Sequence, residues 1–268
     1  MGCITKMNYS IVKWAIALPT IFCTLLLWGC EQMHLKTEIE SNLTLGDIAY
    51  DANKNLGYTI YLSENEKNVP YLVLTNDYGG NVLLLRKHLL DEMKPYRGQS
   101  TIPSYYEESE IDRFLNDDYF RSLSDTIRDI VVDSVVIITD IESIGSVGTN
   151  TQNIHRKIFL LSYSEVAQEG SLVNAVEGRP LKYFIDDPNA VCATTLIGEA
   201  GSWWLRTPNT AYLNTVYGIS PDGYVGVCSV GGAEGVYENG VRPALCLPKN
   251  TAILRDDIDG MNAYIIRS

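Results

Sequence analysis

The sequence predicts an α+β fold, a single domain of residues 55–268 that follows an export signal and a polar tether. Glycine (21) and proline (10) are frequent and tyrosine (17) far outnumbers phenylalanine (5), which favours strands and turns over a helical bundle. Hydrophobic residues make up 46% of the chain and charged residues 20%, enough to build a sizeable core. Strand-like apolar runs and two amphipathic helical segments follow one another without an internal repeat, which indicates one mixed domain.

The segment 1–29 differs in composition from the rest of the chain. Lys6 and Lys13 are its only charged side chains, and they precede an apolar run from Trp14 to Trp28. About fifteen apolar residues are fewer than the roughly 20 that a membrane-spanning helix needs. A basic start followed by a short apolar run is typical of a secretory signal peptide.

The end of this segment, from Leu27 to Cys30, resembles the bacterial lipobox, with a leucine three residues before a cysteine and the small Gly29 directly before it. The resemblance implies cleavage after Gly29 and attachment of diacylglycerol to Cys30. Two or three acyl chains hold a protein firmly in a membrane, so we expect a bacterial cell-envelope protein with its body outside the cytoplasm. The alternative is an ordinary signal peptide in which Cys30 is incidental.

The next segment, residues 30–54, is polar and aperiodic and is predicted to be a tether. Loss of the two leader lysines takes the formal net charge from -12 to -14. Anionic lipid headgroups repel such a charge, so the body is expected to stand off the membrane. A chain this acidic, without a basic run, also argues against nucleic acid as a partner.

Within the domain, alternating apolar residues and turn signals predict strands at 57–62, 70–74, 132–138, 157–161, 211–218, 224–228, 241–247 and 263–266. Val82 to Leu85 is either another strand or the start of a helix. Ser109 and Ser124 are each placed to cap a helix, and a short helix is expected to begin at Ser164. The domain should therefore contain two to three helices.

Four segments carry a family resemblance. They are 110–116, 157–162 with Glu165 just beyond, 203–208 (WWLRTP) and 240–245 (GVRPAL). In this order they resemble an uncharacterised bacterial family, domain of unknown function 6273, over about residues 57–248, with Thr207 where the family usually has serine. The resemblance implies a C-type-lectin-like core, as in formylglycine-generating enzymes and variable surface receptors, and transfers no activity.

The residues of the two motifs, 203–208 and 240–245, have both a functional and a structural interpretation. Trp203 and Trp204 can stack on sugars, but adjacent strand residues point to opposite faces, so at most one should be exposed and a core role is favoured. Arg206 and Arg242 can bind a carboxylate ligand, but buried ion pairs are favoured. These residues and Pro243 are therefore expected to be structural.

Metal binding and catalysis have little support. The acidic loops 186–189 and 256–260 carry oxygen ligands that suit calcium, but neither has the full EF-hand spacing, and solvated turns are favoured. We expect no metal and no cofactor, with calcium left as an alternative. The common catalytic motifs are missing, so no enzyme is predicted.

Three cysteines, Cys192, Cys228 and Cys246, remain in the mature domain. An odd number allows at most one disulfide, and Cys228 can pair with Cys246, although small buried thiols are favoured. The same two cysteines are the only candidates for the reactive pair that formylglycine-generating chemistry requires. Nothing around them in the sequence supplies the cationic setting that activates a thiolate.

The glycine-rich stretch 218–240 lies between the two motif strands. Tyr217, Tyr224 and Tyr237 make it a candidate binding loop, because tyrosine gives a large contact area at little entropic cost. The alternative is a set of hairpin turns with incidental tyrosines. The expected function is recognition of a glycan or a protein, and the open alternatives are an enzyme on the same fold or a structural component of an envelope assembly.

Overall fold

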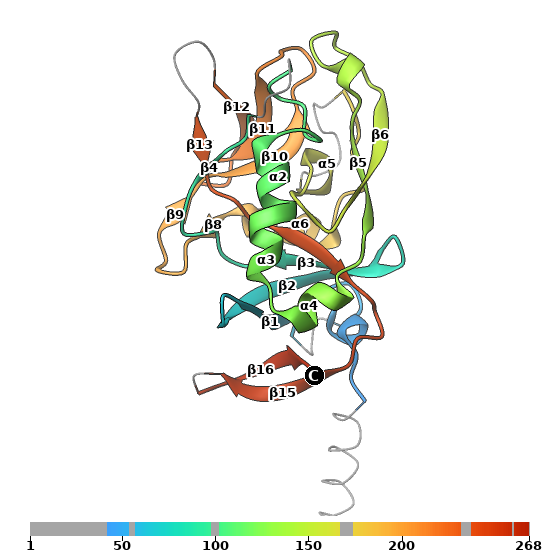
Figure 1. The fold of residues 1–268 in the computed structure, drawn as a ribbon, viewed down its shortest axis with the longest axis vertical. Helices are drawn as coiled ribbons and strands as arrows, with labels where there is room; N and C mark the ends of the chain where they lie inside the picture. The colour runs from blue at the N-terminus through green and yellow to red at the C-terminus, as the bar shows by residue number, and fades with distance from the viewer. Residues whose placement is uncertain are drawn as a thin grey trace, which may run out of the picture. The chain divides into compact units, whose positions relative to one another are not determined.

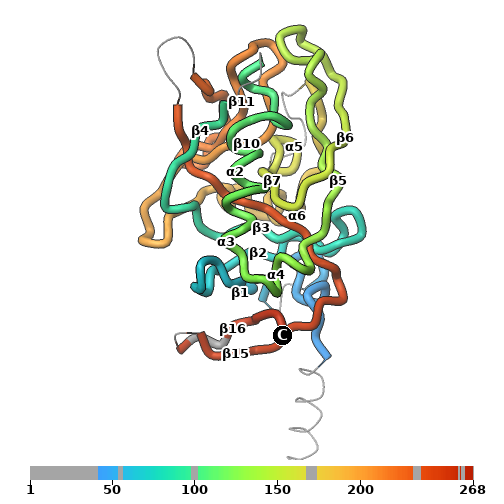
Figure 2. Tube along the Cα trace, viewed as in Figure 1, coloured from blue at the N-terminus to red at the C-terminus, as the bar shows by residue number. Residues whose placement is uncertain are grey.

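A seven-stranded mixed sheet runs through the body of the protein in this computed structural model (Figure 1). Its strand order is β15-β16-β1-β2-β3-β14-β7. The strands are β1 (Thr59–Glu64), β2 (Lys67–Tyr78), β3 (Asn81–Arg86), β7 (Ile158–Phe159), β14 (Ala244–Leu247), β15 (Ile253–Ile258) and β16 (Met261–Ile266). The β1–β16 pair is parallel and the other pairs are antiparallel, so the C-terminal hairpin β15–β16 lies beside β1 (Figure 2).

The structure describes residues 42–53, 57–97, 102–166, 174–231, 237–258 and 260–267. Residues from Thr44 onward form one compact unit. The expected signal peptide, Cys30 and most of the tether lie outside the described residues. No helix in the described ranges is long and apolar enough to cross a membrane.

Smaller sheets surround the large one. A three-stranded antiparallel sheet contains β10 (Trp203–Pro208), β11 (Thr215–Ile219) and β12 (Val225–Ser229). The two-stranded pairs are β4 (Lys94–Pro95) with β13 (Glu238–Asn239), β5 (Ser134–Thr139) with β6 (Thr151–Arg156), and β8 (Ala193–Thr194) with β9 (Ala200–Gly201).

The helical segments are short. One continuous helix consists of α2 (Glu110–Phe114), the π-helical turn η3 (Leu115–Tyr119) and α3 (Phe120–Ser122). The others are α4 (Asp125–Ile130), α5 (Tyr163–Val166) and α6 (Lys182–Asp186), with 3-10 turns η1 (Leu45–Ile48), η4 (Ile141–Ser143) and η5 (Pro188–Val191). The mixed α+β class is therefore confirmed.

The core lies on both faces of the large sheet. Every residue of β2 from Val69 to Leu74 is buried, which requires cover on both faces. The helix α2–α3 stands in front of this sheet in Figure 1. It is joined to β1 by a bridge between Leu123 and Glu64.

The structure differs from the sequence prediction in several places. The predicted strand 241–247 starts only at Ala244, and Ser124 precedes α4 without a side-chain capping hydrogen bond. The tether prediction reaches residue 54, but Leu45 and Ile48 are 0% exposed and Leu45 N–H donates to Thr251 O, so this segment packs in the domain from Thr44. The predicted strand 211–218 starts only at Thr215, because the Asn209 side chain accepts from Ala211 N–H and holds a turn.

Helix α6 is an addition to the predicted two to three helices. Its N-cap residue is Leu181, which makes no side-chain cap, so the sequence carries no start signal. Phe184 is 1% exposed, and its packing stabilises the helix in place of a cap. The helix expected after Ser109 is confirmed, with Ser109 Oγ accepting from Asp112 N–H.

Candidate functional site

The helix α2–α3 borders three hollows in the surface of the described part of the chain. Its middle is the π-helical turn η3, a feature that occurs frequently at functional sites. This turn directs Asn116 at the backbone of Ile158, where the side chain donates to the carbonyl at 2.9 Å and accepts from the N–H at 3.2 Å. It also directs the Tyr119 hydroxyl at Glu64, 2.6 Å from Oε1. The helix is therefore fixed against both neighbouring strands.

One groove of about 770 Å³ runs between this helix and the β5–β6 hairpin. Arg156 binds Asp112 in its wall through two parallel contacts, Nε–Oδ1 and Nη2–Oδ2, each 2.8 Å long. Burial raises the pKa of Asp112 above its ordinary value even though Arg156 lowers it. The remaining lining residues are Glu107, Glu108, Arg113, Asn116, Asp117, Phe120, Asp133, His155 and Lys157.

A second groove of about 500 Å³ lies on the other side of the helix. Its floor is an ion pair in which Arg86 Nε contacts both oxygens of Glu64 at 3.1 Å, with both side chains under 8% exposed. Tyr71 and Tyr119 also donate to Glu64, and their burial raises the pKa of both hydroxyls. This floor is a rigid, hydrogen-bonded surface. Its walls include the apolar residues Val69, Leu90, Phe114 and Leu196.

A third hollow of about 570 Å³ lies along the helix between the two grooves. It shares Arg113 and Asp117 with the first groove and Phe114, Asp118 and Arg121 with the second. The three hollows therefore form one continuous surface, which we call the helix groove.

Two half-buried phenylalanines line the helix groove, Phe120 in the first groove and Phe114 in the second and third hollows. Lys94 Nζ lies 4.8 Å from the centre of the Phe114 ring, and Lys157 Nζ lies 4.6 Å from the centre of the Phe120 ring. Acidic and basic side chains are interspersed along the groove, as in the Arg121 pairs with Asp117 and Asp118. The groove thus offers hydrogen-bonding groups of both kinds without a strong field of one sign.

The two motif tryptophans lie in the core. Trp203 is 0% and Trp204 is 1% exposed, so neither offers a sugar-stacking surface. Their indole N–H groups donate to the carbonyls of Val191 and Lys94, at 3.0 and 2.8 Å. Strand β10 is buried along its whole length, which is why both of its faces take an aromatic residue.

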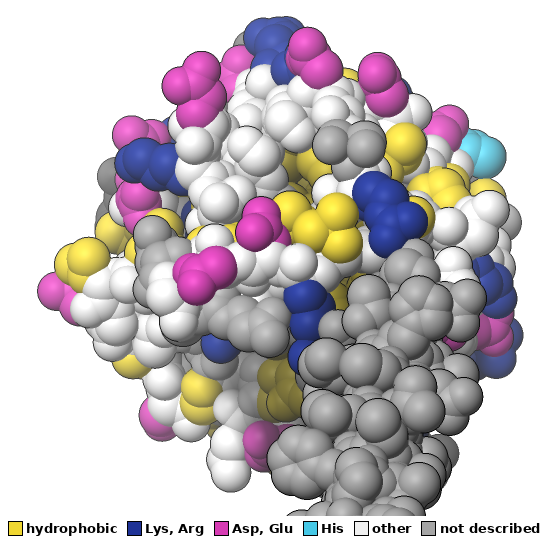
Figure 3. Space-filling model, turned by 90° about the horizontal axis from the view of Figure 1, so that it is seen from below, with side chains coloured by type: hydrophobic (Ala, Val, Ile, Leu, Met, Phe, Trp, Pro, Cys, Tyr) yellow, Lys and Arg dark blue, Asp and Glu magenta, His cyan; other side chains and the backbone are white. Residues whose placement is uncertain are grey.

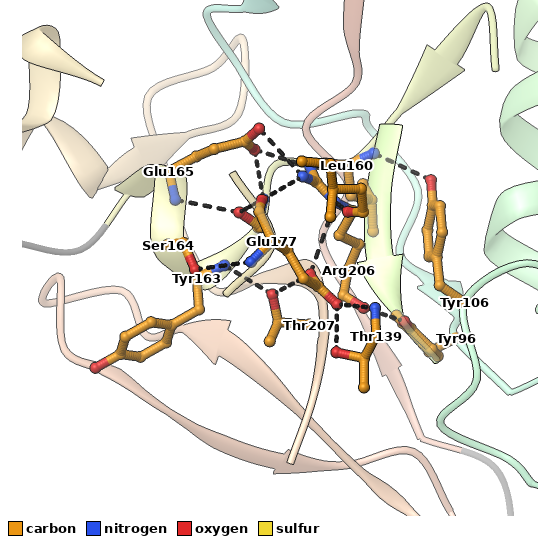
Figure 4. A network of polar contacts seen from close by, with 12 residues as sticks. Tyr96, Tyr106, Thr139, Leu160, Tyr163, Ser164, Glu165, Glu177, Arg206 and Thr207 are labelled. Carbon is orange, nitrogen blue, oxygen red and sulfur yellow. Dashed lines mark hydrogen bonds and ion pairs between the residues drawn. The ribbon is translucent and has the colours of Figure 1, made fainter. Parts of the chain in front are cut away.

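Arg206 is the centre of a buried polar network (Figure 4). All five of its N–H donors have partners: both Glu165 oxygens and the carbonyls of Ile137, Leu160 and Glu177. The Glu177 carboxylate accepts from Thr139 N–H, Thr139 Oγ1 and Thr207 Oγ1, and burial raises its pKa. The favoured buried ion pair is therefore present at Arg206, and it leaves no donor for a ligand.

Arg242 is placed differently. It is 2% exposed, its Nε donates to Arg86 O at 2.9 Å, and its guanidinium lies 5.3 Å from the Trp203 ring. It forms no ion pair with a carboxylate among the described residues, so the expected buried pair is wrong here. Pro243 is buried beside it, and its carbonyl accepts from Arg86 N–H.

The three candidate tyrosines do not form one site. Tyr217 faces the same side of its sheet as its partner Val227, and its ring packs edge-on against Tyr163 at 4.6 Å. Tyr224 lies over Gly226, which points to the opposite face. Tyr224 is 71% and Tyr237 53% exposed, whereas Tyr217 is half-buried.

The acidic loops are occupied by local contacts. Asp187 caps η5 by accepting from Asn189 N–H, and Asp257 accepts from Gly260 N–H in the β15–β16 turn. Asp259 lies outside the described residues. Within the described ranges, no group of three or more histidine, cysteine or acidic side chains is placed to hold a metal ion.

The cysteines lie in different environments. Cys246 is buried in β14 of the large sheet, Cys228 is half-buried in β12 of the three-stranded sheet, and Cys192 is exposed. All three are free thiols. Burial raises the pKa of Cys228 and Cys246, which is the reverse of activation.

Sequence reasoning did not identify the helix groove. The segment 110–116 indicates a family resemblance but no binding surface. Glu64 and Arg86 belong to strands whose apolar pattern is typical of a protein core. The signal that the sequence does contain is the high density of charged residues in 107–121. These charged residues are not needed for the apolar face with which the helix packs on the core, so they remain available to a ligand. Glu177 carries no comparable signal, because it lies in an irregular segment.

Acidic and basic side chains are dispersed around the face of the molecule seen in Figure 3, among small groups of hydrophobic ones.

No curated protein and no solved structure matches the chain, so the C-type-lectin-like core stays a prediction. A family model matches residues 79–249, which include the helix groove's central helix, Glu165, Arg206 and Arg242. The chain therefore belongs to the family described as domain of unknown function 6273.

Proposed function

We propose that this protein is a lipid-anchored recognition protein of a bacterial envelope that binds a polar, near-neutral glycan in the helix groove, without catalysis. The observation that carries the proposal is the continuity of the groove across helix α2–α3, with interspersed charged side chains and a half-buried phenylalanine in each of the two larger grooves.

The chemistry of the groove suits sugar hydroxyls. Each hydroxyl donates and accepts, and the carboxylate of Asp117 and the guanidinium of Arg113 supply both functions on adjacent turns of the helix. Phe114 and Phe120 add half-buried aromatic surface on which the C–H groups of a sugar can pack. The balanced charge does not favour a strongly anionic or cationic polymer, and the elongated surface suits a chain more than a compact ligand.

Binding is supported over catalysis by the state of the carboxylates. Glu64 and Asp112, the most buried acids of the groove, are each held by an arginine, Arg86 and Arg156. The arginines already occupy the oxygens of these two carboxylates, so the carboxylates are not free to contact a reacting substrate. Asp117 is exposed, and its pair with Arg121 lies in solvent, where a ligand hydroxyl can compete for the carboxylate.

The anchor is proposed from the sequence around Cys30. Metabolic labelling with a radioactive fatty acid should label the wild-type chain, and Cys30→Ser should abolish the label and release the protein from the membrane fraction. Label that persists in Cys30→Ser would contradict the anchor without affecting the proposed groove.

The groove is tested by binding. The full chain in detergent would be titrated with neutral, acidic and basic polysaccharides, and Kd measured by calorimetry. We expect saturable binding to a neutral polysaccharide, weakened about tenfold or more by Phe120→Ala and several-fold by Asp117→Asn. Asp129→Asn, an exposed helical acid outside the groove, is the matched control and should bind normally. Binding that both groove variants leave unchanged, or no binding to any polysaccharide, would overturn the proposal.

A further inference from the structure

Arg242 is a buried cation without a counter-ion in the part of the chain that the structure describes. Its side chain is 2% exposed, and its Nη1 has no hydrogen-bond partner among the described residues. The contacts that hold it are one hydrogen bond from Nε to Arg86 O and the face of the Trp203 ring. Burying a charged group without a partner is costly, and a cation–π contact offsets only part of that cost.

The other buried arginines of the domain provide the comparison. Arg206 pairs with Glu165, Arg86 with Glu64, and Arg156 with Asp112. In each of these the acidic partner raises the pKa of the guanidinium above its ordinary value. Burial instead lowers the pKa of Arg242 to about 10. Among the described residues, each of these three arginines has an acidic partner, whereas the buried Arg242 has none.

The surroundings of Arg242 also favour an anion. Burial lowers the pKa of the half-buried His88, and the nearby charges of Lys87, Arg86 and Arg242 lower it further, so three cations lie near one another in an otherwise acidic protein. The Tyr183 hydroxyl and the Cys192 thiol also lie close to Arg242, and neither supplies a carboxylate as counter-ion. Cys192 is exposed, so this side of Arg242 borders the surface.

We propose that Arg242 is the base of a binding site for a small carboxylate. A carboxylate accepts from the two terminal nitrogens of a guanidinium in parallel, and Nη1 is the donor left without a partner. The small exposure of the side chain restricts the site to a small acid, or to one carboxylate at the end of a larger ligand. Arg242 and Trp203 do not line the helix groove, so this site is independent of the proposed glycan site.

Thermal unfolding of the full chain in detergent tests this site. Sodium acetate would replace sodium chloride at constant ionic strength and pH 7. We expect a saturable rise in the melting temperature of about 3–5 °C at ten times Kd. Arg242→Gln should abolish the rise. The control Arg255→Gln removes an exposed arginine that also stacks on an aromatic ring, that of Tyr264, and should keep it.

A second measurement needs no variant, in case Arg242→Gln does not fold. Acetate should change the alkylation rate of Cys192 in the wild-type protein, followed by mass spectrometry, with the same midpoint as the thermal shift. A melting temperature that does not depend on the acetate fraction would overturn the proposal, because it means that acetate binds no better than chloride. An equal rise in Arg242→Gln, or a Cys192 rate that acetate does not change, would also overturn it.

Discussion

Arg206 and Glu165 form a two-contact ion pair, Nη1–Oε2 at 2.8 Å and Nη2–Oε1 at 3.1 Å, in which neither side chain is more than 1% exposed. Arg206 comes from β10 and Glu165 from α5, so the pair joins the three-stranded sheet to the segment that follows β7. Tyr78 of β2 donates to the same carboxylate at 2.8 Å and links the network to the large sheet. The motif arginine therefore connects the main parts of the core.

Glu165→Gln should strongly destabilise the fold. Removing one partner of a buried pair leaves an uncompensated charge, which costs about 3–5 kcal/mol. Arg121→Gln, which removes an exposed pair with Asp117 and Asp118, should cost less than about 1 kcal/mol. Urea unfolding at pH 7 measures both, and similar losses for the two variants would contradict the structural role of the network.

Glu177 should make stability depend on pH. Burial raises its pKa above the ordinary value of 4.5, so the folded state holds the proton more tightly than the unfolded chain. Its contribution to stability is then complete below about pH 4.5 and is lost as the pH rises through the raised pKa. Urea unfolding from about pH 4 to about pH 8 should show Glu177→Gln gaining stability relative to wild type as the pH rises. A difference between the two proteins that stays constant with pH would show that the carboxyl does not titrate in this range.

The cysteines should differ in reactivity. Burial raises the pKa of Cys246 to about 12, and Cys246 is 0% exposed, so its thiol should resist alkylation until the protein unfolds. The exposed Cys192 should react first and the half-buried Cys228 more slowly. Mass spectrometry of iodoacetamide-treated protein gives the order of reaction. Urea-unfolded protein is the control, in which this order should disappear because burial no longer protects the thiols. A Cys228–Cys246 disulfide in the purified protein would contradict the structure.

Gly240 should be intolerant of a side chain. A Cβ there would lie 2.3 Å from the carbonyl oxygen of Ser202, and that backbone group cannot move without breaking its bond with Gly240 N–H. Gly240→Ala should cost about 1–3 kcal/mol. At Gly226 the obstructing atoms belong to the exposed ring of Tyr224, which can rotate, so Gly226→Ala should stay within about 0.5 kcal/mol. Equal melting temperatures for the two variants would contradict the close approach at Gly240.

Local signals in the sequence predict much of the fold. Ser109 marks the start of α2 because its hydroxyl caps the helix, and the alternation in β1 is visible in the residues themselves. Helix α6 is not predictable in this way, since its start has no side-chain cap and it depends on packing partners far along the chain. Arg206 and Arg242 have similar motif contexts, yet only the three-dimensional structure reveals that one has an acidic partner and the other does not.

The residues of the candidate functional site are even harder to predict from local sequence signals than the fold is. The sequence favours Tyr217, Tyr224 and Tyr237 because tyrosine in a glycine-rich loop suits recognition, but the strand register directs Tyr217 and Tyr224 to opposite faces. The helix groove combines segments from six parts of the chain, including Glu64 and Arg156. No local pattern relates residues so far apart.

Hydrogen exchange of the full chain, with and without a saturating polysaccharide, tests the central claim most directly. The account predicts slower exchange on binding in the helix 110–122 and in strand β6, which border the helix groove, and unchanged exchange in β11 and β12. Protection confined to β11, β12 and the residues around Tyr224 would contradict the groove and place recognition in the glycine-rich loops instead.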